Sequence, residues 1–296
     1  MSLHLIVKRL GGDLYDGGRR ANIPAPGHSR RDRSVSLLEQ DGRVVVHSFA
    51  GGDWREIRDH LRALGLLDGR PSELAGPPRA AGDPGDQVRR RGVAQTLWAS
   101  GRSLPGSISE RHCRGRGVGG ALPGPQALRH HPAAPVSVYR DGGATRPALM
   151  AGIVGGDGAL TAVELTYLTA SGRRAFDLAL PRKTVGVLAP GSAVRLDPLA
   201  PTMLVAEGVF TTLAARSRFA LPSWALLSTS NLRRWRAPAG VHSVLIAADR
   251  GRDGEASAEW LAQALIGDGI DATIALPPKS FGDWDDAAKA GCTGSR

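Results

Sequence analysis

Two apolar segments of this chain end at a carboxylate that is followed within a few residues by glycine. The first, LVAEG at residues 204–208, carries Glu207, and the second, VLIAADRGRDG at residues 244–254, carries Asp249 and Asp253. Parallel strands present such residues together at the carboxyl edge of a sheet. Hard divalent cations prefer carboxylate oxygens and bridge them to phosphate oxygens. These three acids are therefore candidate ligands for Mg²⁺ or Mn²⁺, although either motif alone also fits an ordinary turn between a strand and a helix.

The same residue types suit the transfer or cleavage of a phosphodiester. A glutamate beside a metal-bound phosphate moves a proton to or from an attacking hydroxyl, and aspartates hold the ion that neutralises charge in the transition state. We therefore expect Glu207 and Asp249 to be the catalytic pair. Asp253 is a further metal ligand or, alternatively, a cap at the start of a helix.

From about residue 196 to its end, the sequence resembles a Toprim domain, the metal-dependent fold shared by bacterial primases, topoisomerases and some nucleases. The first signature of that family, a glutamate between a strand and a glycine, is matched by Glu207 and Gly208. Its second signature is an Asp-x-Asp that ends another strand, and here Asp249 takes the first position while Gly251 takes the second. Gly251 has no side chain with which to bind a metal. The order of the motifs is that of the family, and one expected ligand is missing.

A third acidic segment, FGDWDD at residues 281–286, is similar to the Asp-x-Asn-Asp ending of primase-type Toprim domains. The resemblance implies that Asp283 and Asp286 also serve as metal ligands. It further implies a magnesium or manganese cofactor for the whole site.

Near the N-terminus, residues 24–53 resemble the zinc ribbon that precedes primase catalytic domains. Such ribbons carry Cys-Pro-x-His, then Asp-Arg-Ser-x-Ser, then His-Cys-Phe-x-x-Cys. In this chain Ala25, Ser48 and Gly52 stand where cysteines are expected, which leaves His28 as the one obvious ligand type in a ligand position. A zinc site needs about four such ligands, so we expect no structural zinc. The alternative is a small, unrelated hairpin and helix.

Together the two resemblances imply a primase-like protein of the plasmid or phage type. Such a protein would bind single-stranded DNA and nucleoside triphosphates and carry out nucleotidyl transfer, with unwinding left to a separate helicase. Two alternatives stay open. One is a Toprim nuclease that cleaves phosphodiesters with the same site, and the other is a nucleic-acid-binding accessory protein in replication whose catalytic site has decayed, which the missing cysteines and Gly251 favour.

The distribution of charge supports a polyanionic partner. Residues 1–140 carry 22 Lys and Arg against 13 Asp and Glu, and residues 141–296 carry 16 against 15. A basic front half suits nucleic acid, although a codon bias toward arginine explains part of the excess. The sequence shows no membrane-spanning run, no signal peptide and two distant cysteines, so we expect a cytoplasmic protein without membrane contact.

Strands and helices alternate in the last third of the chain. Apolar runs predict strands at residues 203–206, 224–227, 243–248 and 272–276, with helices at 209–216 and 255–266 between them. Such alternation is typical of an α/β fold, here a Toprim-like parallel sheet flanked by helices. Basic residues after the second strand and the third are candidate contacts for nucleic acid, with Trp235 offering a stacking surface. They are Arg233, Arg234, Arg236 and Arg250.

Two smaller regions are expected to precede this sheet. Strands at residues 35–38 and 43–47 joined by an Asp-Gly turn, followed by a helix that Asp53 and Glu56 cap and Gly65 ends, predict a β-hairpin and helix domain. A second hairpin at residues 148–154 and 160–167 and a short helix at 94–100 predict an α+β middle region. The expected boundaries are 1–68 for the degenerate ribbon, 69–87 for a linker rich in Pro and Gly, 88–198 for the middle region and 199–296 for the Toprim-like domain.

Overall fold

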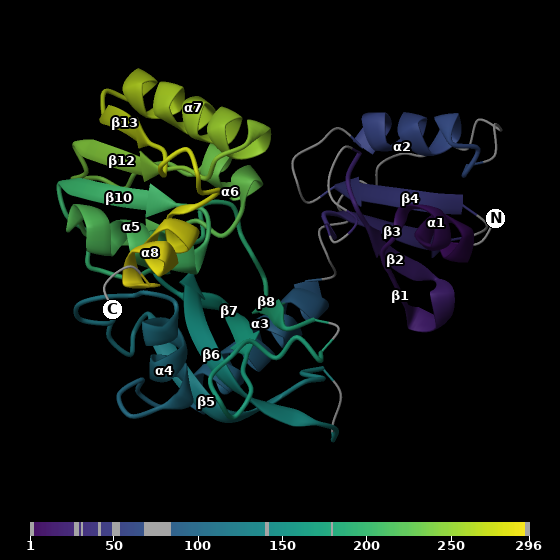
Figure 1. Cartoon of the computed structure of the whole chain (residues 1–296), viewed down its shortest axis with the longest axis horizontal. Coiled ribbons are helices and arrows are strands. Elements are labelled where there is room, and N and C mark those ends of the chain that lie inside the picture. The colour runs from purple at the N-terminus through teal and green to yellow at the C-terminus, as the bar shows by residue number, and fades with distance from the viewer. Residues whose placement is uncertain are drawn as a thin grey trace. The chain divides into compact units, whose positions relative to one another are not determined.

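The computed structural model describes residues 3–26, 30, 32–40, 43–48, 54–67, 84–139, 142–178 and 180–293. The chain forms two compact units, Met1–Asp83 and Pro84–Arg296, whose relative placement is not determined (Figure 1). Among the described residues, every helix is too short or too polar to cross a bilayer.

The first unit is a four-stranded antiparallel sheet with two helices. Its elements are α1 (Leu3–Leu10), β1 (Asp13–Tyr15), η1 (Asp16–Gly18), β2 (Arg20–Ile23), β3 (Val35–Gln40), β4 (Arg43–Ser48) and α2 (Trp54–Ala63). The strand order is β1-β2-β3-β4. Leu3 and Ile6 of α1 and Ile57 and Leu61 of α2 are buried with Leu37 of β3 in one core.

The predicted hairpin and helix are both present in this unit. Strands β3 and β4 pair from Val35 to Gln40, and α2 ends just before Gly65, whose φ of 66° is in the left-handed region that glycine tolerates. The sheet contains two strands that the sequence does not predict, β1 and β2, because both are too short and too polar to give an alternating apolar pattern. The Asp-Gly turn at residues 41–42, the ribbon positions at 27–29 and 49–53, and residues 69–83 of the predicted linker lie outside the described residues. Residues 84–87, the last part of that predicted linker, are helical.

The second unit begins with an antiparallel sheet. Its elements are α3 (Pro84–Ala99), α4 (Ile108–Gly115), β5 (Leu128–Pro135), β6 (Thr145–Val154), β7 (Leu160–Tyr167) and β8 (Arg182–Gly186). The strand order is β5-β6-β7-β8, and α3 covers one face by packing on β7 and β8. The predicted hairpin corresponds to β6 and β7. The helix predicted at residues 94–100 corresponds to α3, which begins earlier, at Pro84, than its apolar residues indicate.

The rest of the unit is a mainly parallel sheet between two layers of helices. Its elements are β9 (Val194–Arg195), β10 (Thr202–Ala206), α5 (Val209–Phe219), β11 (Ser223–Ala225), α6 (Thr229–Arg234), β12 (Ser243–Ala247), α7 (Arg252–Gly267), β13 (Asp271–Ala275) and α8 (Trp284–Thr293). The order is β13-β12-β10-β11-β9, with β9 antiparallel and the other four strands parallel. This confirms the predicted α/β fold with a parallel sheet flanked by helices.

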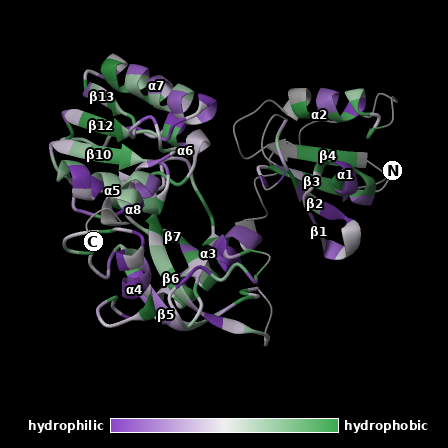
Figure 2. Cartoon of the chain, in the orientation of Figure 1, coloured by the Kyte–Doolittle hydropathy of each residue, from purple (hydrophilic) through white to green (hydrophobic). Residues whose placement is uncertain are grey.

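Alternating residues of β10 explain the two helical layers. Met203 and Val205 belong to the core shared with α6 and α7, whereas Leu204 and Ala206 belong to the core shared with α5 and α8. Both faces of the sheet are covered, and β10 and β12 are accordingly apolar after their first residues, Thr202 and Ser243 (Figure 2).

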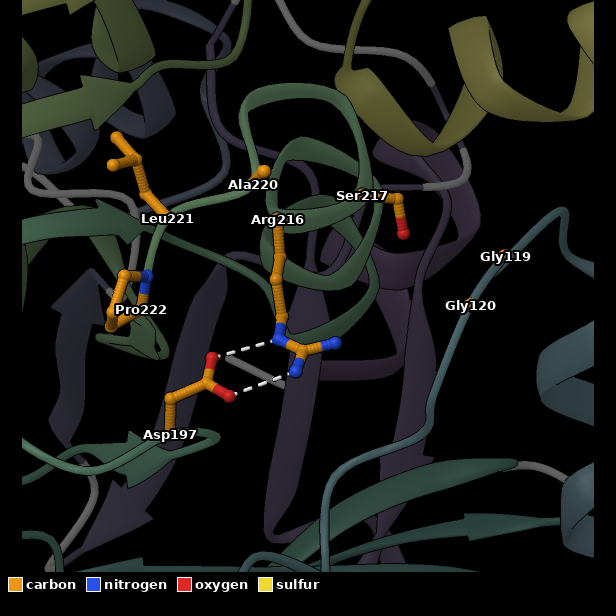
Figure 3. A pocket seen from close by; sticks show the side chains of 8 residues that line it. All are labelled: Gly119, Gly120, Asp197, Arg216, Ser217, Ala220, Leu221 and Pro222. Carbon is orange, nitrogen blue, oxygen red and sulfur yellow. Dashed lines mark hydrogen bonds and ion pairs between the residues drawn. The ribbon is translucent and has the colours of Figure 1, made fainter.

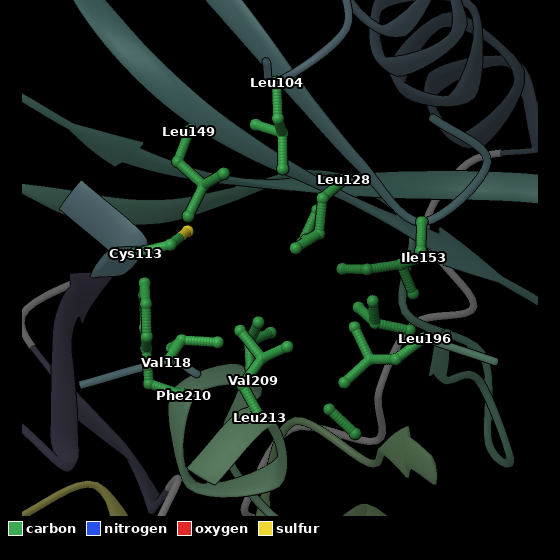
Figure 4. Packing of buried hydrophobic residues seen from close by; sticks show 14 of the residues in the cluster. Leu104, Cys113, Val118, Leu128, Leu149, Ile153, Leu196, Val209, Phe210 and Leu213 are labelled. Atoms are coloured by element: carbon green, nitrogen blue, oxygen red, sulfur yellow. The ribbon is translucent and has the colours of Figure 1, made fainter. Parts of the chain in front are cut away.

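A further core joins the antiparallel sheet to helix α5. Leu128 of β5 and Leu149 and Ile153 of β6 pack with Phe210 and Leu213 of α5 (Figure 4). The helix that begins directly after Glu207 is therefore held on one side by its own sheet and on the other by the antiparallel sheet. This double packing sets the direction in which the chain leaves β10.

Candidate functional site

The two predicted catalytic acids lie at the same edge of the parallel sheet. Glu207 follows the last residue of β10, and Asp249 comes two residues after the end of β12. These strands are neighbours in register, with Ala206 opposite Ala247. The charge of Glu207 raises the pKa of Asp249, so the structure brings the two carboxylates into electrostatic contact.

Glu207 is largely buried at the base of this edge. Burial raises the pKa of its carboxyl, and the charge of Asp253 raises it further. The positive charge of Arg182 and a hydrogen bond donated by the backbone N–H of Thr229 act in the opposite direction. Glu207 is thus a carboxyl whose proton affinity is tuned by groups from three different elements, an arrangement that is enriched at functional sites.

Asp249 is the most strongly perturbed acid of the site. Burial, followed by the charges of Glu207 and Asp283, raises its pKa to about 7, although a hydrogen bond with the side chain of Thr211 opposes the shift. Its Oδ1 atom is buried and has no hydrogen-bond partner among the described residues. A buried carboxylate oxygen without a donor is costly. A proton or a hard cation would satisfy it, so this donor set fits the magnesium ion that a Toprim fold implies.

The third acidic segment forms a close cluster at the start of α8. Among the described residues, Asp283, Asp285 and Asp286 form a group of three acids whose oxygens all lie within 4.8 Å of one another. Asp283 accepts a hydrogen bond of 2.7 Å from the backbone N–H of Asp286, and its charge acts on Asp249 more strongly than that of Asp286 does. Asp283 is therefore the member of the cluster that the structure couples to Asp249.

The middle acid of the cluster, Asp285, has a different environment. It is buried, and both of its oxygens accept from Arg116 while Oδ2 also pairs with Lys289 at 2.5 Å. Lys289 pairs with Asp286 as well, at 2.8 Å. Asp285 thus anchors α8 through a buried ion pair, whereas Asp283 keeps its coupling to Asp249. Sequence reasoning missed this anchor because Arg116 lies in a distant basic segment with no motif spacing.

Asp253 is not a helix cap, and this alternative was wrong. Helix α7 begins with Gly251 at its N-cap position, and Asp253 lies in the first turn, where its carboxylate accepts from Arg233 at 2.6 Å. The backbone of Gly251 has φ 120° and ψ 157°, a combination that is essentially restricted to glycine. Local geometry explains why glycine stands where the Toprim pattern has its second aspartate.

Three of the four predicted nucleic-acid arginines already have partners within the chain. Arg233 binds Asp253 and Ser257, Arg236 donates to the carbonyl of Trp235, and Arg250 donates to the carbonyl of Pro277. Arg234 is exposed. Their contact with nucleic acid stays a prediction.

The stacking surface predicted at Trp235 was wrong. Its side chain is 1% exposed and meets Trp224 edge-on, with ring centroids 6.4 Å apart. The indole is part of the core beneath α6 and α7, so a base cannot stack on it. The structure shows instead a tryptophan packed in the core directly after helix α6.

An open pocket of about 470 Å³ lies elsewhere in this unit, lined by Asp197 and Arg216 among others (Figure 3). It adjoins the C-terminal end of α5, whereas Glu207 precedes the N-terminal end of the same helix. Arg216 holds Asp197 with two hydrogen bonds of 2.7 and 2.8 Å and also donates to the carbonyl of Ala121. The charges of the pocket are therefore satisfied internally, and the acid site does not lie in it.

Comparison with known proteins gives two family matches in the second unit. Residues 202–293 match the Toprim domain, and residues 88–196 match a domain of unknown function (DUF7146). No curated protein matches the sequence of the chain.

Several solved structures of DNA primases are similar to the chain. The primase fragment of the bacteriophage T7 primase-helicase protein shares 15% identity over 64% of this chain and 70% of that one, with a TM-score of 0.41. The Aquifex aeolicus primase with its zinc binding and RNA polymerase domains shares 14% identity over 99% of this chain and 81% of that one, with a TM-score of 0.44. A DNA primase domain from Pseudomonas aeruginosa shares 17% identity over 54% of this chain, which spans about half (52%) of that structure, with a TM-score of 0.36. The family match over residues 202–293 confirms the Toprim resemblance that the acidic motifs of this segment indicate.

Proposed function

We propose that this protein is a primase-like nucleotidyltransferase that acts on single-stranded DNA and uses a magnesium or manganese ion at the edge of its parallel sheet. The observation that carries the proposal is the coupling of two partly buried acids, Glu207 and Asp249, which follow neighbouring parallel strands. The unpartnered Oδ1 of Asp249 supports a cation at that position. Nucleoside triphosphates are the second substrate in this proposal, and a separate helicase would supply the single strand.

The residues of the site suit the steps of such a reaction. Glu207, whose pKa is raised by burial, is placed to take a proton from an attacking hydroxyl. Asp249 and Asp283 would hold the ion, which when bound neutralises charge on the phosphate. Arg182 of β8 lies within electrostatic reach of Glu207 and is the basic residue that the antiparallel sheet contributes to this edge. A guanidinium there suits a phosphate oxygen.

A second candidate is a nucleic-acid-binding accessory protein with a decayed site. Two observations favour it: Gly251 lacks a metal-binding side chain, and Asp253 is held by Arg233 instead of being free for a metal. Phosphodiester cleavage by the same acids is the third alternative. It differs from nucleotidyl transfer in needing no nucleotides.

The deciding experiment is primer synthesis on single-stranded DNA by the full chain and by a Glu207→Gln variant. We expect synthesis that requires Mg²⁺ or Mn²⁺ and nucleotides and that is lost in the variant, while the far-ultraviolet circular dichroism stays the same. Glu259→Gln on the exposed face of α7 is the matched control. Equal activity in Glu207→Gln would remove the proposed role, and degradation of labelled DNA without nucleotides would show the nuclease instead.

A further inference from the structure

We propose that the acid site of this chain takes a single divalent cation, held at Asp249, and that the guanidinium of Arg233 occupies the carboxylate that a second cation would require. The inference rests on the proposed metal-dependent function and concerns how many ions the site can hold. The Asp-x-Asp pattern of Toprim domains supplies two aspartates at this turn, and this chain supplies one.

The first ion has the donors that it needs. Asp249 offers a buried oxygen to which no described residue donates a hydrogen bond, and Glu207 and Asp283 lie within electrostatic reach of it. Magnesium in phosphate-transferring sites is commonly held by one or two carboxylates, with water and substrate phosphates completing the octahedron. Asp249 with either neighbour meets that requirement.

A second ion does not find free carboxylates. At Gly251 the backbone conformation admits essentially only glycine. In the α8 cluster, Asp285 is bound by Arg116 and Lys289, and Asp286 is bound by the same lysine. These ion pairs place two positive charges among the three acids of the cluster. The cluster is therefore poorly suited to gathering a further divalent charge.

Asp253 is a further acid whose charge acts on Glu207, and Arg233 holds it. The guanidinium contacts Asp253 at 2.6 Å through one nitrogen and the hydroxyl of Ser257 at 2.9 Å through Nε. Both side chains of the pair are about two-thirds buried, with exposed fractions of 30% and 35%. A cation that bound Asp253 would lie beside this guanidinium and would be repelled by it. Arg233 therefore already supplies, beside Asp253, the positive charge that a second ion would bring.

The test counts manganese ions on the full chain. Free Mn²⁺ is followed by its electron paramagnetic resonance signal during titration, in the absence of nucleotides and DNA. We expect one bound ion per chain, lost in Asp249→Asn and retained in Asp253→Asn. Arg233→Gln frees Asp253 and should add a second, weaker ion, which the double variant Arg233→Gln with Asp253→Asn should lose again. Arg234→Gln, which removes the exposed neighbouring arginine, is the matched control and should leave the count at one.

Each other result has a definite meaning. Two ions on the unaltered chain, falling to one in Asp253→Asn, would overturn the proposal. A count of one in a folded Arg233→Gln variant would overturn the role of Arg233. If that variant does not fold, Asp253→Asn in the unaltered background decides between one ion and two. No bound manganese in any variant would contradict the metal site itself, and with it the proposed function, which is a different result from a count of two.

Discussion

Replacing Asp249 by asparagine is expected to stabilise the metal-free protein. The carboxyl is partly buried, one of its oxygens has no hydrogen-bond partner among the described residues, and three other acids raise its pKa. Asparagine has nearly the same shape and carries no charge. The substitution therefore removes a charge that the folded protein solvates poorly.

The size of the effect follows from the pKa. The pKa of Asp249 rises from its ordinary value of 3.8 to about 7, and one pKa unit corresponds to about 1.36 kcal/mol. Because the folded pKa lies above the unfolded one, the folded protein binds the proton more tightly. The contribution of Asp249 to the free energy of unfolding is therefore most favourable at low pH, falls as the pH rises from 3.8 to about 7, and stays low above that. Relative to the unaltered chain, we expect Asp249→Asn to gain about 1.6 kcal/mol at pH 5 and about 4 kcal/mol at pH 8.

Urea unfolding with a chelator present, at pH 5 and pH 8, measures this difference. Asp271→Asn, at an exposed position of β13, is the control and should change little. Added Mg²⁺ should stabilise the unaltered chain, because the ion binds the folded state, and should leave the variant unchanged. Equal stability of the two proteins at pH 8, or a difference that does not grow between pH 5 and pH 8, would refute the argument from burial.

Two further substitutions test how the site is held. Gly254→Ala would place a methyl group 2.6 Å from the backbone oxygen of Asp249, so we expect the free energy of unfolding in urea to fall by about 1–3 kcal/mol and manganese to bind more weakly. The control is Gly267→Ala at the other end of α7, where no atom lies within 4 Å of the added methyl group, and it should be neutral or stabilising by up to about 1 kcal/mol. Equal effects of the two substitutions would contradict the close packing at Gly254. Arg116→Gln leaves the buried Asp285 with Lys289 alone and should lower the free energy of unfolding by about 3 kcal/mol. The control Arg146→Gln breaks the exposed pair with Asp177 and should lower it by less than about 1 kcal/mol. A similarly small decrease for Arg116→Gln in thermal or urea unfolding would show that Lys289 alone is enough to pair with Asp285.

The sequence predicts the parallel sheet well because its strands are buried on both faces. Residues 203–206 and 244–248 are continuously apolar, and turn residues follow them. The strands of the first unit are harder to detect. Arg20–Ile23 alternates only over four residues, and Asp13–Tyr15 has one aliphatic residue, Leu14, too few to show an alternation. The pairing of β1 with β2, and of β2 with β3, is a tertiary contact that no local pattern encodes.

The site could be predicted in part for the same reason. Glu207 and Asp249 follow buried strands, so strand order alone brings them to one edge. The sequence does not show which of the acids are paired with basic side chains. Asp253 looks like a further ligand in the sequence, but Arg233, 20 residues away, neutralises it. Asp285 stands between two predicted ligands, Asp283 and Asp286, and Arg116, 169 residues away, neutralises it. Trp235 follows the same logic, because only the packing of α6 on α7 shows that the indole is buried.

Arg116 also shows why the acid site belongs to the whole second unit. The arginine lies directly after α4, in the region that matches the domain of unknown function. Its guanidinium lies over the ring of Phe210, 4.2 Å from the centroid, and binds Asp285. Phe210 is three residues after Glu207 and Asp285 is two residues after Asp283, so one side chain contacts both chain segments that carry acids toward Asp249. Since this contact is buried and charged, a shift of α4 would move the acids or leave a carboxylate unpaired. The spacing of the acids at the sheet edge therefore depends on the antiparallel region as much as on the Toprim sheet.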